Sequence, residues 1–391
     1  MTTSPDPLGL TSLEWEALAE SWSLERYRGR QVFDALHRRL TRDYASMREL
    51  PADLRRRLSV ELPIYRPEIV KREVSEDGSA KYGLRLIDGA LIEAVFMPGE
   101  GEGAHVNEFE DARARESAKS EVRDPKAIPE GRLRSSITNR KSHFTVCLSS
   151  QTGCAVDCAF CVTGRLGSGR HLSAGEILGQ LYEILTDVGR TALGLRVVFM
   201  GMGEPFLNPD GVLPALDILF GMISPRHVTV STSGITPAFP LFAERPRRPN
   251  LAVSINAPND EKRARLMPIS RTYPLSGVLS AMRQWPLEPR RRITVEYVLI
   301  SGVNDAREDA AELARLLAGI PVKVNVIPLN EDPVYLPGWK RPEESVIDRF
   351  VKRLADARIP VTVRRSRGND SAAGCGRLKG RLQDSRRRMR V

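Results

Sequence analysis

Apolar residues near the start of the chain recur every three or four positions, which is the period of an amphipathic helix. In the stretch from residue 26 to 40, one face carries Val32, Phe33, Leu36 and Leu40. Thr11 precedes Glu14 by three residues, the spacing of a capping box at a helix start. We therefore expect a small helical accessory domain over residues 1–62. Its arginines make RNA a candidate partner, and the alternative is that the module only packs on the main domain.

The spacing of the apolar residues changes after residue 62. Residues 80–98 alternate apolar and polar positions around Asp88-Gly89, a dipeptide typical of a tight β-hairpin. Residues 63–98 are thus predicted to form an extended β linker with a hairpin. The next stretch, 99–141, has few large apolar residues and is predicted to be a flexible insertion.

From residue 142 to 366, β-branched segments alternate with helical ones. Ser173 and Glu176 form a second capping box at the start of one such helix. The expected strands are HFTVCL, LRVVFMG, HVTVSTS, NLAVSIN, ITVEYVLI and VKVNVIP. Six such units predict an α/β fold, a partial (βα)6 TIM-like barrel of parallel strands with the helical accessory domain at its N-terminal side. In that architecture the active site lies at the carboxyl ends of the strands.

Charge and composition narrow the partners and the compartment. The chain of 391 residues has 59 basic and 49 acidic side chains and a net charge of +10, which favours a polyanionic partner. A basic tail over residues 367–391 contributes much of the excess. The first ten residues lack the pattern of a secretory signal, and no run approaches the length of a membrane span, so we expect no membrane partner and a cytoplasmic location. Five cysteines in so long a chain argue against a disulfide framework.

Three of the cysteines, Cys154, Cys158 and Cys161, follow the spacing C-x3-C-x2-C. Three thiolates on one loop can ligate three irons of a 4Fe-4S cluster and leave the fourth iron open to a substrate. The alternative is a structural zinc site, which needs a fourth protein ligand. No second C-x2-C occurs, and His143 and His171 lack a paired spacing. Both kinds of site therefore place a metal centre in this loop.

Several motifs together resemble one family. They are TVCLSSQTGCAVDCAFC, VVFMGMGEPFLN, VTVSTSG, LAVSINAPNDEKRARLMPIS, EYVLISGVND, VNVIPLN and RSRGNDSAAGCG. In order and spacing the chain is similar to the RlmN/Cfr family of radical S-adenosylmethionine (SAM) methyltransferases that act on ribosomal RNA. The resemblance implies a radical-SAM barrel with one 4Fe-4S cluster on Cys154, Cys158 and Cys161, and two SAM molecules consumed per turnover.

The resemblance also assigns three residues outside the cluster loop. It implies that Cys375 becomes methylated and carries the methyl carbon to the base. It implies that Cys147 resolves the resulting adduct by a transient disulfide with Cys375, and that Glu93 accepts the proton from the methylated carbon. Without the family, Cys147 is a small strand residue, and Glu93 belongs to the solvated face of an alternating strand.

A further set of residues resembles the family's SAM contacts. GMGEP alone indicates only a glycine-rich turn that a ligand can approach closely. By resemblance the contacts are Gly203, Glu204, Ser231, Ser254, Ile255, Asn256 and Asn330. Asn256 departs from the family pattern, which usually has histidine there.

The implied activity is methylation of C2 of an adenosine in 23S rRNA, and of an adenosine in the anticodon loop of tRNA, with a low-potential electron donor such as flavodoxin. Methylation at C8, as in Cfr, uses the same cysteines and remains an alternative within the family. A divergent paralogue with another RNA target, or a non-catalytic RNA-binding protein with structural zinc, are the other hypotheses.

Overall fold

The computed structural model describes residues 6–99, 143–364, 378 and 380. The predicted insertion therefore lies almost wholly outside the described residues, and so does the basic tail with Cys375. None of the helices within the described ranges has the length and apolar character needed to cross a bilayer.

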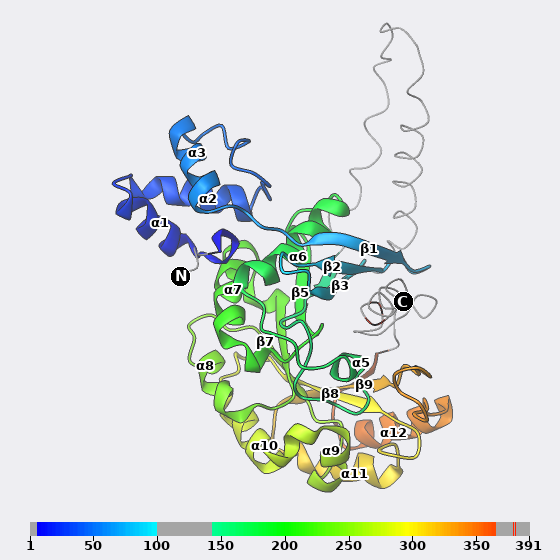
Figure 1. Cartoon of the computed structure of the whole chain (residues 1–391). Coiled ribbons are helices and arrows are strands. Elements are labelled where there is room, and N and C mark those ends of the chain that lie inside the picture. Colours follow the sequence, from blue (N-terminus) through cyan, green and yellow to red (C-terminus); the bar gives the residue numbers. More distant parts are fainter. Residues whose placement is uncertain (1–5, 100–142, 365–377, 379, 381–391) are drawn as a thin grey trace, which may run out of the picture.

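The N-terminal module consists of helices α1 (Ser12–Ser21), α2 (Arg26–His37) and α3 (Ala52–Glu61). The capping box at the start of α1 is confirmed. The module packs on α6 (Ala174–Asp187), where the buried ring of His37 lies 2.5 Å from the Tyr182 hydroxyl. The second predicted capping box, at the start of α6, is also confirmed. Figure 1 shows the module in blue beside α6.

One sheet of ten strands runs through the molecule, with the strands in chain order from β1 to β10. The pairs from β1 to β4 are antiparallel and those from β4 to β10 are parallel. The strands are β1 (Glu68–Val74), β2 (Ala80–Arg85), β3 (Leu91–Met97), β4 (Phe144–Cys147), β5 (Leu195–Phe199), β6 (Val228–Thr232), β7 (Asn250–Ser254), β8 (Ile293–Leu299), β9 (Val322–Pro328) and β10 (Val361–Val363).

The predicted hairpin and the six predicted parallel strands are confirmed, β4 to β9 being the six. Two features were not predicted. The hairpin joins the barrel sheet directly, because β3 pairs with β4, and β10 adds a seventh parallel strand. The predicted fold class, an α/β partial barrel with a helical module, is therefore correct, with a longer sheet than expected.

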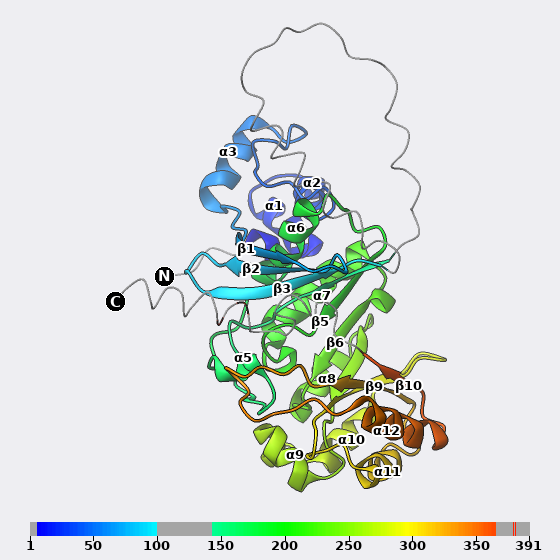
Figure 2. The ribbon, with the colours of Figure 1, turned by 90° about the vertical axis from the view of Figure 1, so that its right-hand side faces the viewer.

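The curved sheet has two chemically different faces. On β8, Val295 and Tyr297 are fully buried, and the Tyr297 ring contacts Phe350 of α12. Alternate residues point the other way, and several of them are polar, such as Ser231 on β6 and Glu296 on β8. Figures 1 and 2 show the helices along the convex side of the sheet. The remaining helices are α5 (Val162–Arg165), α7 (Pro209–Met222), α8 (Phe239–Ala243), α9 (Asp260–Leu266), α10 (Leu275–Gln284), α11 (Arg307–Leu316) and α12 (Glu344–Asp356).

Candidate active site

Ser149 fixes the start of the cysteine loop, directly after β4. Its hydroxyl donates to the Glu93 carbonyl at 2.5 Å and accepts from the Met202 N–H at 2.9 Å. The side-chain amide of Gln180 on α6 bonds both backbone groups of Ser149 at 2.9 Å. Since all these groups are buried, the loop, β3 and the turn after β5 are held in one arrangement.

Two glycines of the predicted site leave no room for a side chain. A Cβ on Gly153 would lie 2.1 Å from the Gly167 carbonyl oxygen, inside the cysteine loop. Gly203 has a φ of +98°, and a Cβ there would lie 2.6 Å from the Gln151 side chain. The Gln151 carboxamide oxygen accepts from the Glu204 N–H at 2.7 Å. The GMGEP turn is therefore packed tightly against the cysteine loop, as only glycine allows.

The three thiols lie in one loop at the carboxyl end of β4. Burial, together with the neighbouring Cys161 thiol, raises the pKa of Cys154 to about 12. Burial likewise raises the pKa of Cys158 well above its usual value, with Cys161 and Cys154 as further causes. Cys158 also packs on a small apolar cluster that includes Leu266 and Leu329. The thiols are thus close neighbours that stay protonated unless a cation stabilises the thiolates.

This donor set fits a 4Fe-4S cluster better than a closed zinc site. Sulfur-only ligation from one loop suits iron–sulfur chemistry, whereas structural zinc needs a fourth protein donor. Within the described ranges, no three histidine, cysteine or acidic side chains already converge as a ligand set. The assignment of the loop to a cluster therefore rests on the three sulfur donors and their spacing.

Glu204 connects the ends of two strands. Its carboxylate accepts from the Phe206 N–H at 2.9 Å and from the Ser233 N–H, beyond β6, at 2.6 Å. Burial raises the pKa of Glu204, and the hydrogen bonds to Ser233 lower it. Phe206 and Thr232 also lower this pKa through hydrogen bonds, so the carboxylate is already well supplied with donors and its predicted contact with the SAM ammonium stays a prediction.

The other predicted SAM contacts follow neighbouring strands. Ser231 and Ser254 are half-buried on β6 and β7, and Asn330 is half-buried just after β9. Ile255 differs from them, because its side chain lies in the main core and its N–H donates to the Glu296 carbonyl. The strand ends thus bring these residues to one edge of the sheet, although Ile255 offers little surface to a ligand.

Asn256 is occupied by the protein itself. Its side chain accepts from the Val298 N–H at 2.8 Å and donates to the Met267 sulfur at 3.1 Å. Its φ of +57° is left-handed, a conformation that asparagine tolerates better than most residues. Asn256 therefore shapes the turn after β7, and its predicted contact with SAM stays a prediction.

Glu93 and Cys147 lie on the same face of the sheet. Val95 is two residues after Glu93 on β3 and pairs directly with Cys147 on β4, so the three side chains share a face. Glu93 is only 2% exposed, and its carboxylate lies 3.5 Å from the Lys81 ammonium. The interpretation of Glu93 as a solvated residue is therefore wrong, because the second face of the strand is also covered.

Arg263 is a site residue that the sequence did not reveal. Its fully buried guanidinium donates to the carbonyls of Ser233, Ser254 and Ile255 at the ends of β6 and β7. Burial lowers its pKa to about 10, and the nearby Asp260 and Cys158 oppose this shift. Neighbouring Lys262 and Arg265 give the same sequence signal, so only the fold separates the buried guanidinium from the others.

Comparisons with known proteins agree with this arrangement. Residues 148–314 match the model of the radical SAM superfamily. The chain is 39% identical over 388 residues to "Dual-specificity RNA methyltransferase RlmN" from Geobacter sulfurreducens, covering 98% of this chain and 94% of that one. It is 40% identical to "Probable dual-specificity RNA methyltransferase RlmN" from Koribacter versatilis, covering 90% and 95%. The solved structure of a radical SAM methyltransferase from Sphaerobacter thermophilus superposes with a TM-score of 0.78 at 37% identity, covering 95% of this chain and 98% of that one.

Proposed function

The chain belongs to the RlmN family of radical SAM RNA methyltransferases, and on that premise we propose that it methylates C2 of an adenosine in 23S rRNA and in tRNA anticodon loops. The observation that carries the proposal is the placement of Glu93 and Cys147 on one concave face, beside the loop of Cys154, Cys158 and Cys161. This arrangement supports a site in which a base, SAM and the cluster meet.

Each residue of the site then has one role in the proposed reaction. Cys154, Cys158 and Cys161 would hold the cluster, which would supply the electron for reductive cleavage of SAM to methionine and a 5′-deoxyadenosyl radical. Cys375 takes a methyl group from a first SAM by displacement and presents it to the base after hydrogen abstraction. Glu93 accepts the proton that leaves C2. Cys147 then attacks Cys375, so that a disulfide forms and the methyladenosine is released.

A basic surface lies at the amino ends of the strands, the opposite edge of the sheet from the candidate site, and favours contact with RNA beyond the target base. We define it by Arg196, Arg226, His227, Arg248, Arg291 and Arg292. The residues are neighbours: burial lowers the pKa of His227, as do His143, Arg196 and Arg226. The Asn250 side chain donates to the Arg226 carbonyl and accepts from Arg291 at 3.4 Å.

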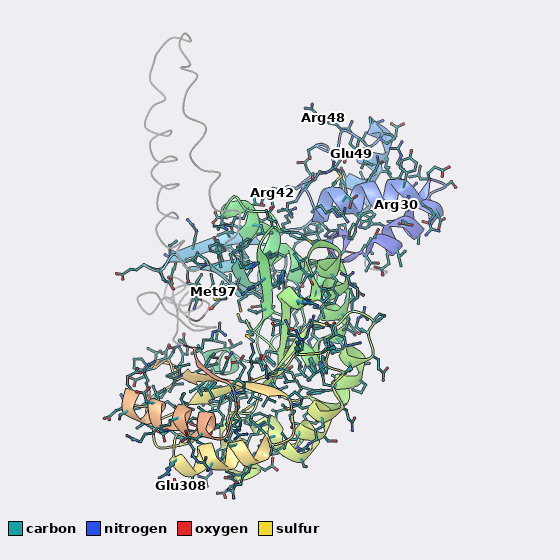
Figure 3. All side chains as sticks on the ribbon, turned by 180° about the vertical axis from the view of Figure 1, so that it is seen from behind. Arg30, Arg42, Arg48, Glu49, Met97 and Glu308 are labelled. Carbon is teal, nitrogen blue, oxygen red and sulfur yellow. The ribbon has the colours of Figure 1, made fainter. Side chains whose placement is uncertain are left out.

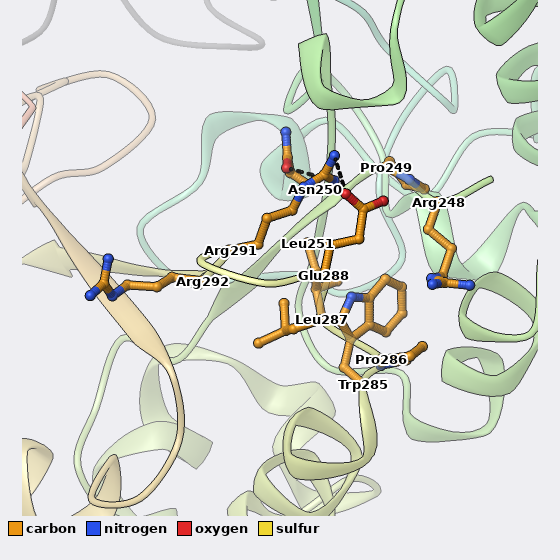
Figure 4. Close-up of a pocket in the computed structure, with 10 residues that line it drawn as sticks. All are labelled: Arg248, Pro249, Asn250, Leu251, Trp285, Pro286, Leu287, Glu288, Arg291 and Arg292. Atoms are coloured by element: carbon orange, nitrogen blue, oxygen red, sulfur yellow. Dashed lines mark hydrogen bonds and ion pairs between the residues drawn. The ribbon is translucent and has the colours of Figure 1, made fainter.

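Figure 4 shows the part of this surface around Trp285. Arg248, Arg291 and Arg292 line a pocket there, and only Arg291 forms an ion pair, with Glu288 at 3.0 Å, in the described part of the chain. Guanidinium groups without carboxylate partners are suited to phosphate oxygens. We infer that the phosphate backbone of the RNA crosses this surface.

The N-terminal module has less free charge than its arginines suggest. Arg26 and Arg30 both pair with Glu16, and Arg39 pairs with Glu49. Figure 3 shows Arg42 where the module meets the rest of the molecule, and there it pairs with Glu183 at 2.5 Å. The module remains a proposed RNA-binding domain, with exposed Arg48 as its best-placed phosphate contact.

The chemistry of the cysteines also indicates the cellular compartment. Free thiols that must alternate between methyl thioether, thiol and disulfide require a reducing compartment, so we infer that the protein works in the cytoplasm. A low-potential one-electron protein donor such as flavodoxin would reduce the cluster.

Mapping modified adenosines tests the function. The protein, reconstituted anaerobically with iron and sulfide, should convert adenosine to 2-methyladenosine in 23S rRNA fragments and tRNA, as identified by mass spectrometry against synthetic standards. Deleting the gene should remove the same modification from cellular RNA. An exclusively C8-methylated product would contradict the proposed regiochemistry, and a colourless zinc-loaded protein without product would contradict the enzyme itself.

A further inference from the structure

Glu296 lies in the middle of β8 on the concave face. Its chain neighbours Val295 and Tyr297 are buried among the helices of the convex side, so the Glu296 side chain points the other way. It pairs in register with Ser254 on β7 and with Asn325 on β9. Glu296 therefore stands in the same row as a predicted SAM contact.

One oxygen of the Glu296 carboxylate is held by a hydrogen bond, and the other has no donor in the described part of the chain. Asn325 donates to Oε1 at 3.1 Å, and the amide oxygen of Asn325 accepts from the Thr362 hydroxyl. Oε2 is buried without a hydrogen-bond partner in the described part of the chain. Burial raises the pKa of Glu296, while Arg364 and Lys323 lower it. A buried acceptor without a donor is unfavourable, so Oε2 is suited to a donor that a ligand brings.

Both reactants of the proposed function carry hydrogen-bond donors. The target adenine has its exocyclic amino group, whereas SAM has ribose hydroxyls, an α-ammonium group and the amino group of its own adenine. Ser231 and Ser254 already provide polar groups for SAM, whereas nothing assigned so far contacts the amino group. In the sheet order, β8 and β3, the strand of Glu93, are separated by β4 to β7, and the curvature of the sheet in Figure 1 brings the two strands to opposite sides of its concave face. A base whose C2 faces Glu93 therefore has its other edge available to β8.

We propose that Oε2 of Glu296 accepts a hydrogen bond from the N6 amino group of the target adenine and thereby selects adenine. The inference rests on the proposed function. A keto oxygen at position 6 would face the carboxylate lone pairs with no proton between them, and a base without a group there would leave Oε2 unpaired. Sites that hydrogen-bond a substrate group reject analogues lacking it by up to about 10⁴–10⁵-fold.

Three RNA substrates test the proposal, with adenosine, purine riboside or inosine at the target position. All three keep the C2 hydrogen, and only adenosine has the amino group. The wild-type protein should lose roughly 10²-fold or more in kcat/KM on purine riboside and more on inosine. Glu296→Ala should lose a similar factor on adenosine and show no further loss on purine riboside. Glu296→Gln, which can donate, should shift the preference toward inosine.

A matched control and two binding measurements keep the alternatives apart. Glu308→Gln makes the same change on α11, where Figure 3 shows Glu308 at the outer surface, and it should behave as wild type. Filter binding of the three RNAs reports base discrimination even if the protein forms no methylated product, so failure of the proposed function is seen separately. If Glu296→Gln weakens SAM binding in equilibrium dialysis and leaves base preference unchanged, the donor belongs to SAM and the proposal is overturned. Unchanged base preference in both variants would also overturn it.

Discussion

Replacing Arg196, Arg226 and Arg292 together by glutamine tests whether RNA crosses the amino-end basic surface. All three side chains are exposed, and none forms an ion pair within the residues that the structure describes. Each phosphate contact lowers the slope of log K against log salt by about 0.7 on single strands and about 0.9 on duplexes. Three contacts therefore account for a slope of roughly 2 to 3. At about 0.15 M salt they raise the affinity roughly 50- to 150-fold over its value near 1 M salt.

The assay is filter binding of a tRNA and of a 23S rRNA fragment between about 50 and 300 mM salt, the range over which such slopes are resolved. The control is Arg307→Gln, Arg315→Gln and Arg349→Gln on α11 and α12, which removes the same charge from exposed positions of the convex side. We expect the first variant to lower the slope and raise KM with little change in kcat, and the control to keep both. Equal slopes for the two variants would refute a local contact, because net charge alone would then explain the effect.

Three further predictions concern single features. Cys147→Ala should accumulate a covalent protein–RNA adduct on denaturing gels, because the resolving thiol is missing, and normal turnover would contradict the two-cysteine mechanism. Cys154→Ala should abolish the brown colour and leave far fewer than the roughly four irons of an intact cluster per chain by iron assay, whereas a full iron content would exclude Cys154 as a ligand. His37 has its pKa lowered by burial to about 3, so its contribution to stability is present above about pH 6.5 and is lost as the pH falls toward 3, at roughly 1.4 kcal/mol per pH unit. His37→Phe should accordingly reduce the drop in melting temperature between pH 7.5 and 5.5, and identical drops would show that another group titrates.

The parallel strands were predictable from sequence because each one is an isolated apolar run between helical segments. Their pairing with the hairpin was not, since the 99–141 stretch separates β3 from β4 and periodicity says nothing about partners that far apart. β10 was missed for another reason. Its three residues, Val361–Val363, are too short to show any period, and only the neighbouring edge of β9 makes them a strand.

In the candidate site, too, local sequence signals could be predicted and contacts between distant segments could not. Cysteine spacing is a local signal, so the loop of Cys154 could be found without a structure. Burial of Glu93 could not, because the alternating pattern of β3 predicts one solvated face and the packing of the concave side covers it. Asn256 was assigned by motif position to SAM, whereas the structure shows both ends of its amide bonded to Val298 and Met267. The burial of Glu93 and the hydrogen bonds of Asn256 depend on contacts between strands, which a single sequence does not reveal.

Ser149 connects the antiparallel part of the sheet, β1 to β3, to the candidate site. In the proposed mechanism, proton removal needs the Glu93 carboxylate at a fixed place relative to the cysteine loop, since misplacement by about 1 Å can cost 10²-fold in rate. One hydroxyl joins the Glu93 carbonyl, the loop after β4 and the Met202 N–H, and continuous pairing of β3 with β4 holds Cys147 in the same frame. A separate domain on a linker could not keep that register. The ten-stranded sheet thus holds Glu93, Cys147 and the loop of the three clustered cysteines, the residues of the proposed mechanism, in one frame.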